Sequence, residues 1–176
     1  MNSILKTKNK KSNHTRQLVL TGLIFALALV LSMVENALPV PVPVPGVKLG
    51  LSNIAVMYAL FFLGRNRAIM IAVLKASFIF MMRGGMAGLL SLSGGLVSLA
   101  VMMLLMLLFK DRISYLILSV FGAVFHNLGQ FTVVSYIYTD MFLWGYLPVL
   151  LISGVAAGVV TSVILRGILP AFKRLA

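Results

Sequence analysis

The sequence predicts an all-α integral membrane protein, a six-helix bundle with both termini in the cytoplasm. Of its 176 residues, 61% are hydrophobic and only 10% are charged, whereas soluble domains are roughly 45–50% apolar and about 25% charged. The apolar residues form long runs, and basic residues gather in alternate segments between them, as in multi-pass membrane proteins. This composition excludes a water-soluble globule and a disordered chain.

Six apolar stretches are expected to cross the bilayer within one membrane domain over 17–170. A spanning helix needs about 20 residues. The second and third stretches are short, and Arg65-Asn66-Arg67 separates them. Because two arginines are hard to bury in lipid, two tilted spans are favoured over one broken hairpin, and whether both cross completely stays open. The expected spans are 17–37, 51–64, 68–82, 86–109, 113–138 and 145–168.

Basic residues predict the topology. A basic tail over 1–16 precedes the first span, and a short tail over 171–176 follows the last. With the N-terminus inside, the outer side holds only Lys48 and, near its boundary, Arg83. Lys and Arg concentrate in cytoplasmic loops, so both termini are placed in the cytoplasm. The net charge of +12 therefore indicates membrane orientation and contact with lipid headgroups, not nucleic-acid binding.

Two further features belong to the expected outer side. Proline alternates with valine from Pro39 to Pro45, and proline lacks the amide hydrogen that a helix needs. This segment is expected to be an extended strap, either a stiff linker or a lid over an outward cavity. Trp144, with Tyr136, Tyr138 and Tyr146, predicts an aromatic belt at the membrane interface.

Lys75 is the most informative polar residue, because it lies near the middle of an apolar stretch. A lysine at the bilayer centre costs about 2.5–3.5 kcal/mol. It is expected to face a polar cavity inside the bundle, unless its chain reaches out to an interface. Glu35 is the only acid near the apolar interior of a span. It either pairs with Lys75 or Arg83, or ends its helix among the headgroups.

A second polar cluster consists of His126, Asn127 and Gln130. His126 and Gln130 are four residues apart and share one helix face. These groups either contact a ligand or make hydrogen bonds between helices. A lone histidine without a second histidine or a carboxylate is a poor metal site, so no metal is expected.

Small residues predict close helix packing. Gly22 and Ala26 have the small-xxx-small spacing, which Ala28 and Ser32 repeat. Such faces let helices approach closely inside a bundle or between subunits. A weaker candidate runs from Gly84-Gly85 to the small residues of 91–95, which either pack closely or form unwound backbone around a cavity.

Several chemistries are excluded. The chain has no P-loop and no cysteine, and its three acids form no Asp-rich pair that could hold magnesium against pyrophosphate. We therefore expect neither an enzyme nor a bound cofactor.

The segment Pro45-Gly46-Val47-Lys48-Leu49-Gly50-Leu51-Ser52-Asn53, followed by Lys75 and Arg83-Gly84-Gly85, resembles the Gx transporter family, also labelled heptaprenyl diphosphate synthase component I. The resemblance covers about residues 16–170. That family is similar to the S components of energy-coupling factor (ECF) transporters, six-helix proteins that bind vitamins or similar small molecules from outside. They pair with a transmembrane coupling subunit and two ATPases.

The resemblance implies that small residues of the first helix, here Gly22, Ala26 and Ala28, contact such a coupling subunit. It also implies a connection with flavin-based extracellular electron transfer, quinone synthesis or isoprenoids, because some family members are encoded with such proteins. A flavoprotein or a quinone-pathway protein is therefore a second kind of partner.

The leading hypothesis is an S-component-like, substrate-binding membrane subunit of an ATP-driven importer. Three cations, Lys48, Lys75 and Arg83, outnumber Glu35, so an anionic or acceptor-rich ligand is expected. The alternative is a membrane scaffold or accessory subunit in electron transfer or isoprenoid diphosphate synthesis. The residues expected to line an outward-opening cavity are Glu35, Asn36, Lys48, Asn53, Lys75, Arg83, His126, Asn127 and Gln130.

Overall fold

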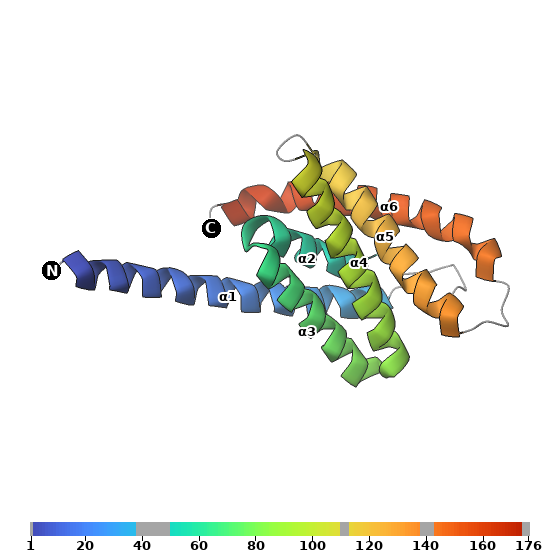
Figure 1. The fold of residues 1–176 in the computed structure, drawn as a ribbon, viewed down its shortest axis with the longest axis horizontal. Helices are drawn as coiled ribbons and strands as arrows, with labels where there is room; N and C mark the ends of the chain where they lie inside the picture. The colour runs from blue at the N-terminus through green and yellow to red at the C-terminus, as the bar shows by residue number, and fades with distance from the viewer. Residues whose placement is uncertain (1, 38–49, 110–112, 138–142, 174–176) are drawn as a thin grey trace.

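The computed structural model describes residues 2–37, 50–109, 113–137 and 143–173, and the predicted all-α, six-helix class is confirmed (Figure 1). A short 3-10 helix, η2 (Leu143–Tyr146), precedes the last helix. The α-helices are α1 (Asn2–Ala37), α2 (Leu51–Phe62), α3 (Arg65–Arg83), α4 (Gly85–Phe109), α5 (Tyr115–Ile137) and α6 (Leu147–Lys173).

Two helix starts differ from the expected spans by three residues or more. The helix α1 begins at Asn2, so the expected basic tail is a continuation of the first helix, and it projects beyond the bundle in Figure 1. The helix α3 begins at Arg65 rather than at 68, because the chain turns at Gly64, which has a positive φ of 95° that glycine adopts without strain. The segment Arg65-Asn66-Arg67 is therefore the first turn of α3 rather than a loop.

Within the described residues, four helices are long and apolar enough to cross a membrane: the segment Thr15–Ala37 of α1, the whole of α4 and α5, and Leu147–Gly167 of α6. The chain is therefore a multi-pass membrane protein. The helix α2 has 12 residues and is about 18 Å long, short of the roughly 30 Å of a hydrocarbon core. The helix α3 is long enough, but it carries three arginines and Lys75.

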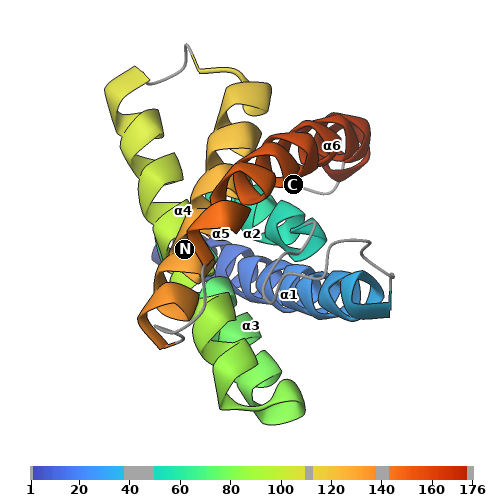
Figure 2. The ribbon, with the colours of Figure 1, turned by 90° about the vertical axis from the view of Figure 1, so that its right-hand side faces the viewer.

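The short helix α2 forms the centre of the bundle. Figures 1 and 2 both place it between α1 and α6, and eight of its residues are buried. The core around it takes side chains from every other α-helix, namely Ile24, Ala28, Ala68, Ile71, Ala72, Leu99, Met102, Leu118 and Leu165. A helix that is apolar on all sides is stable only when it is surrounded in this way. The outer surface is also apolar, with Val19, Met81 and Ile152 all exposed.

Glycines allow α4, α5 and α6 to pack closely. A β-carbon on Gly158 of α6 would lie 2.5 Å from the Cα atom of Val120 in α5, and one on Gly94 of α4 would lie 2.8 Å from the carbonyl oxygen of His126. The helix α4 is continuous from Gly85 to Phe109. Residues 91–95 are therefore helical, with Gly94 at a close helix contact, so the unwound alternative is wrong for this stretch. Gly84, between α3 and α4, is not helical.

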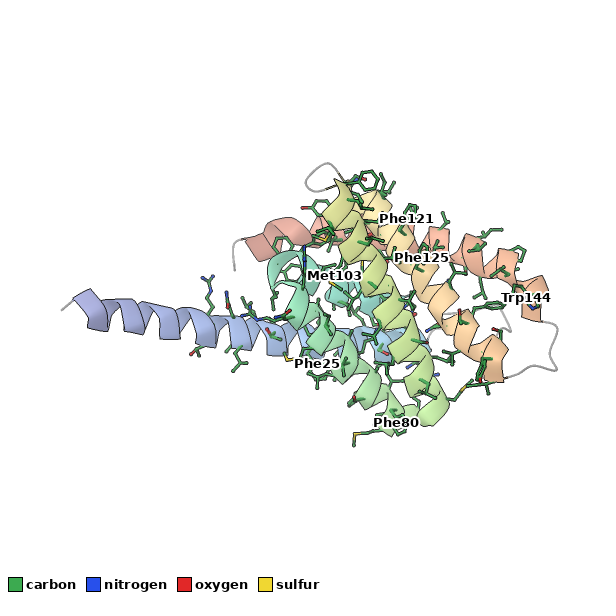
Figure 3. All side chains as sticks on the ribbon, in the orientation of Figure 1. Phe25, Phe80, Met103, Phe121, Phe125 and Trp144 are labelled. Atoms are coloured by element: carbon green, nitrogen blue, oxygen red, sulfur yellow. The ribbon has the colours of Figure 1, made fainter. Side chains whose placement is uncertain are left out.

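In Figure 1, α1 begins and α6 ends towards the same side of the molecule, which is what the predicted topology requires. Trp144, labelled in Figure 3, is exposed at the other end of α6. It packs edge-on against Phe131, with ring centroids 5.7 Å apart. Tyr136 is also exposed. The proline strap, Lys48 and Tyr138 lie outside the described residues, as does the side chain of Tyr146.

Candidate functional site

A polar cavity lies among helices α1 to α5, near the ends at which α1 and α3 finish and α2 begins. Its volume is about 80 Å³, measured as the space open to the centres of water molecules. One water needs at least about 10–15 Å³ on this measure, so several waters or a small ligand group fit. The lining residues are Ser32, Glu35, Ser52, Lys75, Ile79, Arg83, Ala87, Leu90, Ser91, His126 and Gln130.

Lys75 contributes a fully buried ammonium to this cavity. Only 1% of its surface is exposed, and its Nζ donates hydrogen bonds to Ser52 Oγ at 3.1 Å and to Asn53 Oδ1 at 3.2 Å. Both acceptors belong to the first turn of α2. The side chain therefore points into the bundle and does not extend to an interface.

The start of α2 depends on Gly50, which has a left-handed backbone with φ of 73°. This conformation suits glycine because a β-carbon would be strained there. The backbone N–H of Gly50 donates to a carboxylate oxygen of Glu35, and the Gly50 carbonyl accepts from the N–H of Asn53 at 2.8 Å. Glu35 thus fixes the turn that presents Ser52 and Asn53 to Lys75.

Glu35 is itself buried, with 3% of its surface exposed, and it lines the same cavity as Lys75 and Arg83. Its position beside the first turn of α2 is favourable, because a helix N-terminus carries partial positive charge. Its hydrogen bond to Gly50 gives this carboxylate a structural role in addition to its charge in the cavity.

Arg83 lies at the exposed side of the cavity, at the last residue of α3. Its Nη1 donates to the side-chain oxygen of Asn36 at 2.6 Å, which joins the ends of α3 and α1. Gly84 follows with a positive φ of 88° and lets the chain turn directly into α4. The guanidinium is thus held at the cavity entrance.

The helix α5 supplies His126 and Gln130, which are 5% and 4% exposed. The side-chain amide of Gln130 donates to His126 Nε2 at 3.2 Å. Its Oε1 is buried and has no hydrogen-bond partner among the described residues. The close approach of Gly94 presses α4 against both side chains and fixes this wall of the cavity.

Asn127 has a different role. Its amide donates to the carbonyl oxygen of Leu150 at 3.1 Å and to Ser153 Oγ at 3.5 Å, and both acceptors belong to α6. This is the interhelical hydrogen bonding that polar residues provide in membrane bundles. Asn127 does not line the cavity.

The structure brings five of the nine expected residues together in the cavity wall: Glu35, Lys75, Arg83, His126 and Gln130. Asn36 and Asn53 do not line the cavity, but they accept hydrogen bonds from Arg83 and Lys75. Lys48 lies outside the described residues. Within those residues, no three His, Cys, Asp or Glu side chains gather as metal ligands would.

Three serines in the cavity wall were not predicted as site residues: Ser32, Ser52 and Ser91. Ser32 precedes Glu35 by three residues and so shares its helix face, and Ser52 is adjacent to Asn53. These separations from Glu35 and Asn53 are the sequence signals that could have identified Ser32 and Ser52 as site residues. Serine in a membrane helix is common at packing contacts, so its presence alone does not indicate a ligand site.

An apolar groove lies next to the cavity, between α1 and α3. Its volume on the same measure is about 320 Å³, and it shares three lining residues with the cavity, namely Ser32, Ile79 and Arg83. Its other lining residues are Leu29, Met33, Asn36, Phe78 and Met82. The groove therefore places an apolar surface directly beside the charged entrance.

The small residues of α1 separate onto two faces. Gly22 and Ala26 are exposed, and a β-carbon on Gly22 would meet nothing within 4 Å. Ala28 is fully buried in the core. Of these three residues, Gly22 and Ala26 are therefore open to a partner subunit and Ala28 is not.

Comparison with known families gives a match to the family described as heptaprenyl diphosphate synthase component I, over residues 24–168. This region includes α2 to α5 in whole, most of α6, the part of α1 from Ile24 onward, and every residue that lines the cavity. No curated protein and no solved structure matches the chain. This multi-pass membrane protein with a charged internal cavity therefore belongs to the heptaprenyl diphosphate synthase component I family.

Proposed function

We propose that the chain is the substrate-binding membrane subunit of an ATP-driven importer of a small molecule. The observation that carries this proposal is Lys75, a fully buried cation in the wall of a polar cavity. A buried ammonium is costly in a membrane bundle, and the hydrogen bonds that join α3 to α2 through the neutral side chains of Ser52 and Asn53 give no reason for a charged donor. Binding of a ligand by that charge gives such a reason.

The charges and open hydrogen-bonding groups of the cavity define the ligand. Lys75 and Arg83 supply two positive charges against the single negative charge of Glu35, so a carboxylate, a phosphate or another strong acceptor is favoured. Arginine holds such a group through two parallel hydrogen bonds, while lysine acts as a point charge. The buried Oε1 of Gln130 costs about 1–3 kcal/mol when unpaired, so the ligand also carries a donor there or leaves a water in place.

Transport would be driven by partner chains. The sequence contains no P-loop, so ATP hydrolysis would come from separate ATPases, joined through a coupling subunit. The exposed Gly22 and Ala26 on α1 allow another helix to approach closely. The ligand would enter from the outer face, which the distribution of basic residues assigns to the cavity end of the bundle.

Gentle purification followed by mass spectrometry of retained small molecules tests this proposal. The expected result is an anionic or acceptor-rich compound in stoichiometric amount, with ATPase and coupling subunits in the same preparation. Recovery of flavoproteins without ATPases would contradict transport and support the scaffold alternative. In that case the cavity would serve a quinone or a protein segment in a redox complex.

The apolar groove supports a second candidate function, as an accessory subunit in isoprenoid diphosphate synthesis. A molecule with a charged head in the cavity and an apolar chain in the groove would contact Arg83 at the junction. The chain has too few acids to bind magnesium diphosphate by an Asp-rich pair, so a soluble partner would perform the chemistry. Prenyl diphosphate formation that stops when this chain is omitted from a reconstituted mixture would favour this function.

A further inference from the structure

A second polar pocket lies at the other end of the bundle from the Lys75 cavity, where α1, α2 and the start of α3 meet. Its volume is about 250 Å³ on the measure used above. We call it the Arg16–Arg67 pocket after the two cations in its wall. Neither the family nor the proposed importer function explains it.

Arg67 is held in place but retains donors. Its Nη2 donates to Gln17 Oε1 of α1, and its Nη1 donates to the carbonyl oxygen of Leu63 at 3.4 Å. A guanidinium has five N–H donors in a rigid plane, so three have no partner among the described residues. The group is half-buried, which weakens screening of its charge by solvent. A fixed guanidinium with open donors is suited to the oxygens of a phosphate.

The remaining wall of the pocket is largely apolar. Leu20 and Phe62 line it, and Phe62 stacks on Tyr58 with ring centroids 4.6 Å apart. Arg16, which is exposed, supplies the second positive charge. The pocket thus joins a cationic rim to an apolar surface. An anionic phospholipid has the complementary groups, a negatively charged phosphate and apolar acyl chains.

The pocket also lies where the apolar sequence of α1 starts. The apolar run begins at Leu18, directly after Arg16 and Gln17, so these two residues are expected near the lipid headgroups. Arg67 is in the first turn of α3, at the same level. This is the end of the bundle that the distribution of basic residues predicts to be cytoplasmic. Basic pockets between membrane helices on that side bind anionic lipid headgroups.

We propose that the Arg16–Arg67 pocket binds the phosphate of an anionic phospholipid, with part of an acyl chain against Leu20 and Phe62. A soluble phosphate ester has the same charged group and would use the same arginines. The apolar wall favours the lipid, because it gains burial that a soluble ester does not. This site is independent of ligand binding at Lys75.

Native mass spectrometry of the full chain in a neutral detergent tests the proposal. The probes are short-chain phosphatidylglycerol, phosphatidylcholine of equal chain length, and glycerol 3-phosphate. The wild type should bind phosphatidylglycerol more tightly than the other two. Arg67→Gln should weaken that binding about fivefold, and Arg16→Gln, at an exposed position, should weaken it by a similar factor.

Arg65→Gln is the matched control, because Arg65 is exposed on the same helix turn and does not line the pocket. It should bind phosphatidylglycerol as the wild type does. Equal binding by wild type, Arg67→Gln and Arg16→Gln, or an equal loss in Arg65→Gln, would overturn the site. Tight arginine-dependent binding of glycerol 3-phosphate without a preference for the lipid would support the phosphate site and overturn its assignment to a phospholipid.

Discussion

The ammonium of Lys75 lies 3.1 Å from the hydroxyl oxygen of Ser52, which ties the middle of α3 to the first turn of the central helix α2. The two residues are 23 positions apart in the chain. This contact connects the fold to the proposed binding site, because one side chain both joins two helices and supplies the charge of the cavity.

Replacing Ser52 by alanine should destabilise the protein and weaken ligand binding together. The variant removes a hydrogen bond to a charged donor, and such bonds contribute about 1.5–3 kcal/mol. Thermal unfolding in detergent and ligand affinity are the two measurements. Ser77→Ala is the control, since Ser77 is exposed on α3 and, among the described residues, bonds only to the carbonyl of Val73 in its own helix. A Ser52→Ala variant as stable as the control would show that the Lys75 contact contributes nothing.

The exchange Glu35→Gln should preserve the fold and strengthen binding of an anionic ligand. Glutamine keeps an oxygen that can accept from the Gly50 N–H, while the negative charge that opposes the ligand disappears. Removing one like charge from a partly buried site is expected to raise affinity by about fivefold or more. Isothermal titration with the retained ligand measures this. Weaker binding would instead indicate that Glu35 contacts a donor or a cation on the ligand.

Asn127 and Gln130, three residues apart on α5, should respond differently to alanine. Asn127→Ala removes the hydrogen bonds to α6 and should lower stability by about 0.6–2 kcal/mol, with little effect on ligand affinity. Gln130→Ala removes a cavity group and should lower affinity more than stability. Parallel unfolding and binding curves for both variants separate these effects. The roles assigned to the two residues are wrong if the pattern is reversed.

Close packing of α5 against α6 depends on Gly158. Valine there would drive its β-carbon to 2.5 Å from the Cα of Val120, and overpacking of this kind costs about 1–3 kcal/mol. The melting temperature of Gly158→Val should therefore fall clearly. Gly167→Ala on the same helix is the control, because a β-carbon at Gly167 would meet nothing within 4 Å. Comparable melting temperatures for both variants would contradict the packing of these helices.

The features that could be predicted from the sequence are those that depend on the energetic cost of placing charged and polar groups in a membrane. A charge at Lys75 and paired polar groups at His126 and Gln130 are expensive in a membrane, so they had to face the interior, and the structure places all three in one cavity wall. The apolar runs located the helices for the same reason. The assignment of Lys75, His126 and Gln130 as ligand contacts stays a prediction.

Other features could not be predicted because the sequence pattern has two physical meanings. Small residues suit both a partner interface and the protein core, so Gly22 and Ala28 looked alike although one is exposed and the other is buried. A helix turns by about 100° per residue, which carries Asn127 away from the cavity that its neighbour His126 lines. The central position of α2 depends on how all six helices assemble, and no local pattern contains that information.

The most direct test of the proposed binding site is the amount of small molecule that purified Lys75→Met retains relative to wild type, measured by quantitative mass spectrometry. Arg166→Gln, which removes an exposed charge on α6 outside the cavity, controls for net charge. The account predicts that Lys75→Met loses at least about nine-tenths of the bound ligand while Arg166→Gln retains it. Equal retention by folded Lys75→Met and wild type would contradict the assignment of Lys75 to a ligand site.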